Sequence, residues 1–231
     1  AETCADKYSF DREAQDAYAI SSLKKAQAAI QSGAFSSEIT PVEVAQRGGT
    51  VTIDTDEQPM KARFDKIPQL RPAFRKEGTV TAANASSISD GAAAVVLMRQ
   101  SEATKRGLTP LARIVAHTSH AQEPSEFTMA PIGAIGSLLA KTGWDKDAVD
   151  LFEINEAFAV VPMAAIESLE LDAAKVNVNG GACALGHPIG CSGTRIVVTL
   201  LAALANHGKK RGIASLCIGG GEATALAVEL I

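Results

Sequence analysis

The sequence predicts an α/β protein in which short apolar strands alternate with amphipathic helices and an antiparallel pair closes the sheet. Two observations predict this class. The strand-like runs are mostly followed by helical patterns, and the last two runs flank a glycine-rich turn as a hairpin. The runs lie at 111–117, 151–154, 175–179, 213–218 and 223–230. We therefore expect helices layered over a mixed five-stranded sheet.

The N-terminal third is predicted to contain one long helix followed by an irregular excursion. Apolar residues keep a helical spacing over 9–32, where Ser9 can cap the helix and Gly33 can end it. From 39 to 74 the sequence is polar and interrupted by four prolines, with short alternations of apolar and polar residues. This pattern indicates an excursion or a cap rather than part of the core.

Residues 79–107 change in style, with a turn-rich, small-residue segment that leads into an apolar run. The run at 92–98 is typical of a buried strand. A short helix is expected over 101–106, ending at Gly107.

The C-terminal half is predicted to contain three helices between its strands. The first opens at Pro131 and ends before Gly143. The second covers 155–169 and contains Pro162, which should remove one backbone hydrogen bond or kink the helix. The third begins at Ser192.

Composition excludes several classes of protein. The 231 residues are 46% hydrophobic and carry a formal net charge of −4, so we expect no nucleic-acid partner. No apolar run approaches the roughly 18 residues that cross a bilayer, and the first residues lack the pattern of a signal peptide, so we expect no membrane partner. Four irregularly spaced cysteines fit reduced thiols in a cytosol or an organelle matrix better than disulfides or a zinc site. Of the two locations we expect the cytoplasm, and we expect no metal.

The run GGACALGHPIGCSG at 180–193 predicts a tightly shaped loop around His187. Its glycines reach backbone angles closed to other residues, and Pro188 fixes its own φ and lacks a donor. Asn155 follows one predicted strand, and Cys217 lies at the end of another, with Gly219 just beyond it. Loops at the carboxyl ends of such strands gather the chemistry of α/β sheets, so we expect these residues to meet.

Each of these residues also has a purely structural interpretation. Asn155 is a favoured N-cap residue, and His187 can be a structural imidazole satisfied by backbone groups. Cys217 can be a small buried hydrophobic residue, and the glycines at 219–221 can be only a hairpin turn. Together, however, a thiol, an imidazole and an amide suit acyl or proton transfer at a carbonyl. A glycine N–H beside the thiol can stabilise a developing oxyanion.

Several of these motifs resemble the thiolase family of coenzyme A-dependent acyltransferases. NEAFA at 155–159, GGACALGHPIGCSGTRIV at 180–197 and CIGGGEA at 217–223 are similar to three C-terminal motifs of that family. EGTVTAANASSISDGAAA at 77–94 resembles its coenzyme A-contacting segment, and DREAQDAYAISS and LRPAF resemble its loop domain. The resemblance implies a thiolase-like layered fold with a partial loop domain at 1–86, the last helix–strand piece of the N-terminal domain at 87–107 and the C-terminal domain at 108–231.

The resemblance also implies roles for individual residues. His187 would activate an acyl-accepting cysteine and, with a water held by Asn155, form an oxyanion hole. Cys217 would be the acid/base at the α-carbon of acetyl-CoA, and the Gly219 N–H would serve a second oxyanion hole. A coenzyme A thioester is implied as substrate, with no permanently bound cofactor and no metal. The residues implied to line its path are Ser86, Ala82, Leu70, Phe74 and Phe158.

One part of the family pattern is missing from this sequence. The acyl-accepting cysteine of thiolases lies in the N-terminal half, and none of the four cysteines here matches its motif. We therefore expect the chain to be the C-terminal part of a thiolase, inactive alone, whose partners are acetyl-CoA or another acyl-CoA, the missing N-terminal half and further copies in a homodimer or homotetramer. The alternative is a non-catalytic, thiolase-like coenzyme A-binding or scaffold subunit. A condensing enzyme of the same fold is disfavoured by Cys217 in CIGGG.

Overall fold

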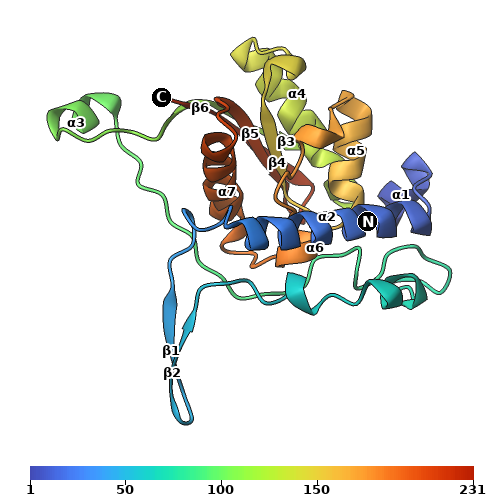
Figure 1. The fold of residues 1–231 in the computed structure, drawn as a ribbon. Helices are drawn as coiled ribbons and strands as arrows, with labels where there is room; N and C mark the ends of the chain where they lie inside the picture. Colours follow the sequence, from blue (N-terminus) through green and yellow to red (C-terminus); the bar gives the residue numbers. More distant parts are fainter.

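The computed structural model describes residues 1–231 and has a four-stranded sheet at its centre, in the order β3-β6-β5-β4 (Figure 1). β4 and β5 are parallel, whereas β6 is antiparallel to both β5 and β3, so the sheet is mixed as predicted. The central strands are β3 (Ala112–Ala121), β4 (Leu151–Ile154), β5 (Arg211–Cys217) and β6 (Glu222–Leu230). The fifth predicted strand, at 175–179, is reduced to one bridge between Val176 and Phe152.

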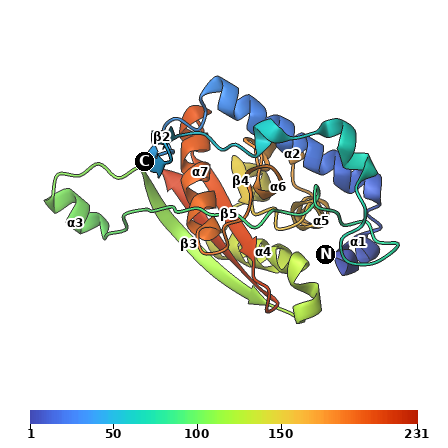
Figure 2. The ribbon, with the colours of Figure 1, turned by 90° about the horizontal axis from the view of Figure 1, so that it is seen from below.

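Helices cover both faces of this sheet, and each face has its own apolar core. α4 (Ala130–Thr142) and α5 (Val160–Leu169) pack on one face, where Phe152 and Ile213 are among the buried residues. α7 (Ser192–Asn206) packs on the other face against Leu151 and Ala214 (Figure 2). Neighbouring residues of each strand thus point to opposite layers, which explains the nearly continuous apolar runs in the sequence.

The long N-terminal helix is divided in two. α1 (Glu2–Tyr8) ends at Ser9, whose φ of 55° is left-handed, and α2 (Arg12–Ser32) then begins. Asp11 rather than Ser9 caps α2, because its side chain accepts a hydrogen bond from Ala14 N. Gly33, with φ 74°, ends α2 as predicted. α2 lies alongside the short α6 (Ala182–Leu185) of the glycine-rich loop (Figure 1).

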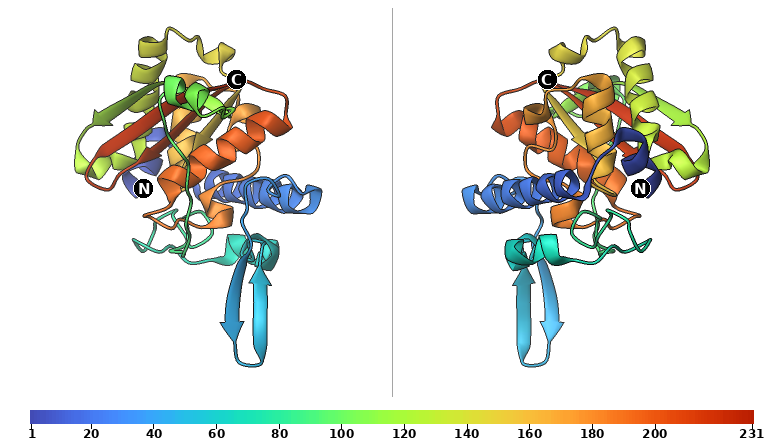
Figure 3. Two further views of the ribbon diagram at one scale, coloured as in Figure 1. Left: turned by 90° about the vertical axis from the view of Figure 1, so that its left-hand side faces the viewer. Right: turned by 90° about the vertical axis from the view of Figure 1, so that its right-hand side faces the viewer.

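The predicted excursion projects from the body as a hairpin. β1 (Val42–Gln46) and β2 (Gly49–Ile53) pair antiparallel and are exposed on both faces (Figure 3). Short 3-10 turns follow at η1 (Pro59–Lys61) and η2 (Phe64–Gln69). Three more connect C-terminal elements: η3 (Pro124–Met129), η4 (Lys146–Ala148) and η5 (Ala173–Lys175).

The prediction of a buried strand at 92–98 is wrong for this structure. The segment is extended but pairs with no strand, so Val96 and Leu97 are 85% and 69% exposed. No strand lies beside its apolar side chains, because the four-stranded sheet ends at β3 on one side and at β4 on the other. The short helix after it, α3 (Gln100–Lys105), forms close to the expected place.

The helix expected over 155–169 begins later than predicted. Residues 155–159 form an irregular connection and α5 starts at Val160, so Pro162 is its third residue. The first N–H groups of a helix have no intrahelical acceptor, and a proline there removes no bond. The expected lost hydrogen bond or kink at Pro162 is therefore absent.

The position of Pro162 near the start of α5 predicts how this helix tolerates substitution. Pro162→Ala should change the free energy of unfolding by less than about 1 kcal/mol, because no backbone hydrogen bond is gained. Ala165→Pro, a full turn further into α5, should cost about 3 kcal/mol or more. Urea unfolding followed by circular dichroism measures both, and comparable losses in the two variants would contradict the assigned helix start.

Candidate active site

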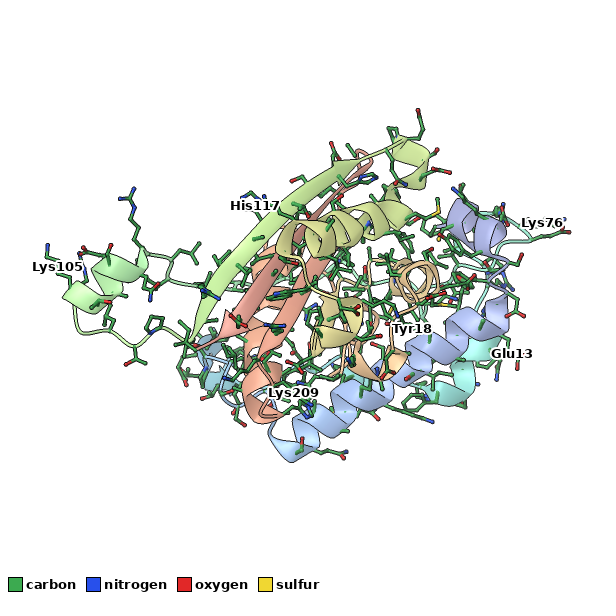
Figure 4. The ribbon with its side chains drawn as sticks, turned by 90° about the horizontal axis from the view of Figure 1, so that it is seen from above. Glu13, Tyr18, Lys76, Lys105, His117 and Lys209 are labelled. Carbon is green, nitrogen blue, oxygen red and sulfur yellow. The ribbon has the colours of Figure 1, made fainter.

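A fully buried carboxylate, Glu156, ties together the segments that build the site. It receives hydrogen bonds from Tyr18 Oη (3.2 Å), Ser22 Oγ (2.7 Å), Asn177 Nδ2 (2.8 Å) and Cys183 N (3.0 Å). Tyr18 and Ser22 come from α2, and Tyr18 points from that helix into the body of the molecule (Figure 4). A buried charge is tolerated only when it is fully hydrogen-bonded, and here the donors come from three separate segments.

Asn177 replaces the pairing that a fifth strand would provide. Its φ is 46°, so the chain turns away from the sheet, and its side chain takes over the hydrogen bonds. Oδ1 accepts from Ile154 N at 2.8 Å, and Nδ2 donates to Ile154 O at 2.8 Å. The carboxyl end of β4 is thereby fixed immediately before Asn155.

The glycine-rich loop approaches its neighbours too closely for side chains at Gly180, Gly181 and Gly186, and the first two of these contact α2 and Glu156. A Cβ at Gly180 would lie 2.5 Å from the Ser22 carbonyl oxygen, and Gly180 also has a left-handed φ of 78°. A Cβ at Gly181 would lie 2.3 Å from the carboxyl carbon of Glu156. The Gly181 N–H donates to Ser22 Oγ at 2.9 Å. These glycines let the loop press against α2 and Glu156.

His187 is held by its backbone and by one ring nitrogen. Its N–H donates to Ser87 O at 2.9 Å, and its Nδ1 lies 2.6 Å from Ser192 Oγ. The Ser192 hydroxyl donates its only proton to Pro188 O, at 3.1 Å. We therefore assign the ring proton to Nδ1, which leaves Nε2 unprotonated and able to accept a hydrogen bond. The prediction that the loop fixes this imidazole is confirmed, whereas its polar partners on the ring are side chains rather than backbone groups.

The imidazole is expected to be neutral at pH 7. Partial burial lowers the pKa of His187, and the positive charge of Arg195 lowers it further. A neutral ring with an unprotonated Nε2 is the form that can accept a proton from a thiol.

Asn155 donates a long hydrogen bond from its side-chain amide to His187 Nε2. Its Nδ2 is 3.4 Å from His187 Nε2, and its backbone N–H donates to Ser215 O at 2.9 Å. The side chain is 1% exposed, and its Oδ1 has no hydrogen-bond partner. The N-cap interpretation of Asn155 is wrong, because the N-cap of α5 is Ala159.

Cys217 ends β5, the strand that pairs in parallel with the strand leading to Asn155, and its side chain makes no hydrogen bond to Asn155 or His187. It is buried in the apolar core under α4 and α5. Burial raises the pKa of its thiol to about 11, so the thiol form dominates at neutral pH. Gly219 lies in the turn between β5 and β6, where Gly221 has a left-handed φ of 105°. The predicted hairpin at these glycines is confirmed.

The residues expected to line a coenzyme A path fall into two groups. The rings of Phe74 and Phe158 pack edge to face with centroids 6.0 Å apart, and Ser86 donates to Ala157 O through both its N–H (3.0 Å) and its hydroxyl (2.9 Å). Leu70 and Ala82 lie in loops and are not part of these contacts. Arg12 of α2 donates to the Leu70 carbonyl at 2.9 Å, whereas Ala82 is exposed.

Three residues that shape the site were not among the predicted site residues. Ser192 is the first residue of α7, so a serine five positions after His187 could have suggested a partner for the ring. Glu156 follows Asn155 in the NEAFA motif, but its donors come from distant segments that the sequence does not place. Asn177 has a recognisable signal only in the tendency of asparagine toward left-handed backbone.

The structure contains no cluster of three or more histidine, cysteine or acidic side chains with the geometry to hold a metal ion. None of its helices combines the length and the apolar character needed to cross a membrane.

Comparisons with known proteins find that this chain is similar to thiolases. Residues 108–230 match the family model described as thiolase, C-terminal domain, and residues 1–101 match thiolase, N-terminal domain. An acetyl-CoA acetyltransferase of Thiocystis violacea is 52% identical over 99% of this chain, and a cytosolic acetyl-CoA acetyltransferase of Mus musculus is 49% identical over 99%. The Bacillus anthracis acetyl-CoA acetyltransferase has a TM-score of 0.96 at 44% identity over 100% of this chain.

This chain spans 59% of the length of the Thiocystis protein and 59% of the Bacillus chain. Because the N-terminal-domain model matches residues 1–101, the expectation of a chain that lacks the N-terminal half is not supported in that form. A further similar structure, the Acat5 thiolase from Ascaris suum in complex with coenzyme A, has a TM-score of 0.94 at 45% identity.

The close approach of Gly181 to Glu156 predicts a large effect of one methyl group. Gly181→Ala should destabilise the protein by about 2–4 kcal/mol, because the methyl group must displace a buried, fully hydrogen-bonded carboxylate. Gly136→Ala in α4 is the matched control, since its Cβ meets no atom within 4 Å and helix propensity should add about 0.5–1 kcal/mol of stability. Chemical denaturation measures the stability of both variants. Equal stability of the two would contradict the structural role assigned to Glu156.

Proposed function

This chain belongs to the thiolase family, and on that premise we propose that the protein carrying it catalyses reversible acyl transfer between coenzyme A thioesters. In the forward direction acetyl-CoA and an acyl-CoA give a 3-oxoacyl-CoA and free CoA. The observation that carries the proposal is the facing pair of His187 Nε2 and Asn155 Nδ2 beside the end of β5. Short acyl groups are favoured by the acetyl-CoA acetyltransferases that resemble this chain.

His187 is proposed to serve in two protonation states. With its proton on Nδ1, the ring can accept a thiol proton at Nε2 as the thiolate attacks an acyl-CoA carbonyl. The resulting imidazolium then donates from Nε2 toward the thioester oxygen. The unpartnered Oδ1 of Asn155 supports a role in holding a water that completes this oxyanion hole.

Cys217 is proposed as the acid/base at the α-carbon. In the condensation direction its thiolate takes an α-proton from acetyl-CoA, and the enolate displaces the acyl group from its thioester, forming a C–C bond as a C–S bond breaks. In thiolysis the thiol returns a proton to the leaving enolate. A pKa of about 11 favours the thiol, which is the form needed to donate. The N–H of Gly219 would stabilise the enolate oxygen.

The coenzyme A path is proposed to pass the coenzyme A-contacting segment. Ser86 joins that segment to the 155–159 connection through Ala157, so a ligand there would lie near Asn155. The edge-to-face rings of Phe74 and Phe158 offer an apolar wall for pantetheine. Leu70 and Ala82 are proposed to extend this path, and the coenzyme A thioester is a substrate rather than a permanent cofactor.

We also propose that none of the four cysteines of this chain accepts the acyl group. Burial raises the pKa of Cys4, Cys183, Cys191 and Cys217, whereas a nucleophilic cysteine needs a lowered pKa. Cys4 and Cys183 also direct their thiols at backbone carbonyls, with sulfur–oxygen distances of 3.8 Å. The acyl-accepting thiol is then supplied by another segment or chain, and these 231 residues alone are inactive.

The oligomeric state and the cellular location of the protein are also proposals. The protein is proposed to form a homodimer or homotetramer, which is supported by apolar side chains paired across the exposed β1–β2 hairpin, such as Val44 with Val51. A cytoplasmic location is supported by the relative of Mus musculus that is named cytosolic. Neither nucleic acid nor membrane is proposed as a partner.

Proton exchange tests the role of Cys217 and separates the enzyme from a scaffold. The protein carrying this chain should exchange the acetyl α-protons of acetyl-CoA with D2O, and Cys217→Ala should slow this exchange by about 100-fold or more, as expected for loss of a general base. Cys4→Ala, which removes another buried thiol, should leave it unchanged. Undiminished exchange in Cys217→Ala would refute the role of Cys217 as the acid/base. If the unmodified protein binds coenzyme A but shows no exchange, the non-catalytic alternative is favoured.

Covalent labelling tests the proposal about the acyl-accepting thiol. The 231-residue chain, incubated with acetyl-CoA and analysed by intact mass after acid quenching, should show no added acetyl group, because each of its thiols is predominantly protonated. Iodoacetamide labelling of the unfolded chain serves as the control that all four thiols are free. An acetyl group mapped to any of the four cysteines would overturn the proposal.

A further inference from the structure

One continuous segment, residues 84–89, is hydrogen-bonded to both parts of the candidate active site, and we call it the bridging segment. At its start, the Ala159 N–H donates to Asn84 O at 2.8 Å, on the connection that follows β4. Further along, the His187 N–H donates to Ser87 O at 2.9 Å, on the glycine-rich loop. The bridging segment therefore links the connection that begins with Asn155 to the loop that carries His187.

The second half of the bridging segment lies along the glycine-rich loop. Ile88 and His187 form an isolated parallel bridge, and the Ile88 side chain is 95% exposed. Side chains alternate along an extended segment, so Ser87 and Ser89 face the loop instead. A Cβ at Gly186 would overlap Ser89 Oγ and would lie 3.1 Å from Ser87 Oγ. Both serines thus lie against the backbone that places the imidazole.

The hydroxyl of Ser87 is held by the side chain of Gln58. Ser87 Oγ donates to Gln58 Oε1 at 2.7 Å, and Ser89 Oγ lies 2.9 Å from Ser87 Oγ. A hydroxyl has one proton, so Ser89 is the donor in the second of these bonds. The side-chain oxygen of Gln58 is therefore the final acceptor of a short chain of hydrogen bonds beside His187.

Gln58 is itself fixed to the body of the protein. It directly precedes η1, whose first residue, Pro59, is buried. Gln27 of α2 donates from Nε2 to Pro59 O at 2.8 Å. The contact of Gln58 with Ser87 therefore connects the glycine-rich loop to α2, the helix that also donates to Glu156.

Stability alone gives little reason for the bond between Ser87 and Gln58. Both side chains are partly exposed, so water could take the place of either partner at small cost. The bond does, however, fix the direction of the Ser87 residue whose carbonyl receives the His187 N–H. Asn155 Nδ2 and His187 Nε2 are already 3.4 Å apart, so a small displacement of the loop would break their contact.

We propose, resting on the acyl-transfer function above, that Ser87 and Gln58 are positioning residues for His187. Gln58 holds the Ser87 hydroxyl, the Ser87 carbonyl holds the His187 N–H, and the imidazole is thereby kept facing Asn155. Both residues act through the backbone of the glycine-rich loop rather than on the reacting atoms. Loss of the bond between them should therefore slow acyl transfer more than it weakens binding of the thioester.

Steady-state kinetics of the protein that carries this chain test the proposal. Gln58→Met, which lacks the acceptor, should lower kcat about 5-fold and leave KM for the thioester within about 2-fold. Gln58→Glu keeps an acceptor oxygen and should retain kcat within about 2-fold. Ser87→Ala should match Gln58→Met, and the double variant should lose no more than either alone, because the two side chains form one bond. Gln69→Met, which loses an exposed bond to Asp65 O, is the matched control and should leave kcat unchanged.

Hydrogen exchange at the His187 backbone amide separates this proposal from the proposed function, because it needs no catalysis. Exchange should be faster in Gln58→Met and in Ser87→Ala, but not in Gln58→Glu or Gln69→Met. This result in a protein without acyl transfer would support the positioning role while the function fails. Unchanged exchange in Gln58→Met, equal falls of kcat in Gln58→Met and Gln58→Glu, or additive losses in the double variant would each overturn the proposal. If Gln58→Met does not fold, Ser87→Ala carries the same comparison.

Discussion

The buried carboxylate of Glu156 is the interaction on which the rest of the site depends. An ionised carboxylate away from water is costly, and four hydrogen bonds from α2, Asn177 and the glycine-rich loop offset that cost. Removal of any one donor would leave one hydrogen-bonding position of the buried carboxylate without a partner, so these segments are constrained together. The loop can come this close only because Gly181 has no side chain. The close approach of the glycine-rich loop and the burial of the carboxylate therefore depend on each other.

This constraint also determines where the reactive groups can be. Asn155 directly precedes Glu156, and the parallel pairing of β4 with β5 brings the end of β5, with Cys217, to the same edge of the sheet. His187 comes from the far end of the loop that Glu156 anchors, and Ser192 at the start of α7 sets its ring orientation. A parallel strand pair, a glycine-rich loop and a helix N-terminus therefore each supply one component.

The sequence was sufficient where the signal is local, and insufficient where a distant partner decides the outcome. The glycine-rich loop, α7 and the β5–β6 hairpin follow from residue spacing and turn chemistry, and all three were predicted. The run at 92–98 has the composition of a buried strand, but a strand needs a neighbour and this structure provides none. At 175–179 the alternating pattern was overridden by the left-handed backbone of Asn177, whose side chain replaces strand pairing. The contact of His187 with Asn155 could be expected from the strand ends, whereas the donors of Glu156 are spread over more than 150 residues and required the fold.

The deep burial of the thiols has a consequence for the durability of the protein. Peroxides and alkylating agents react with exposed thiolates, so cysteines that are buried and hard to ionise are attacked slowly. All four cysteines are buried, and each has a raised pKa. Slow reaction of these four thiols with oxidants is thus expected while the chain is folded.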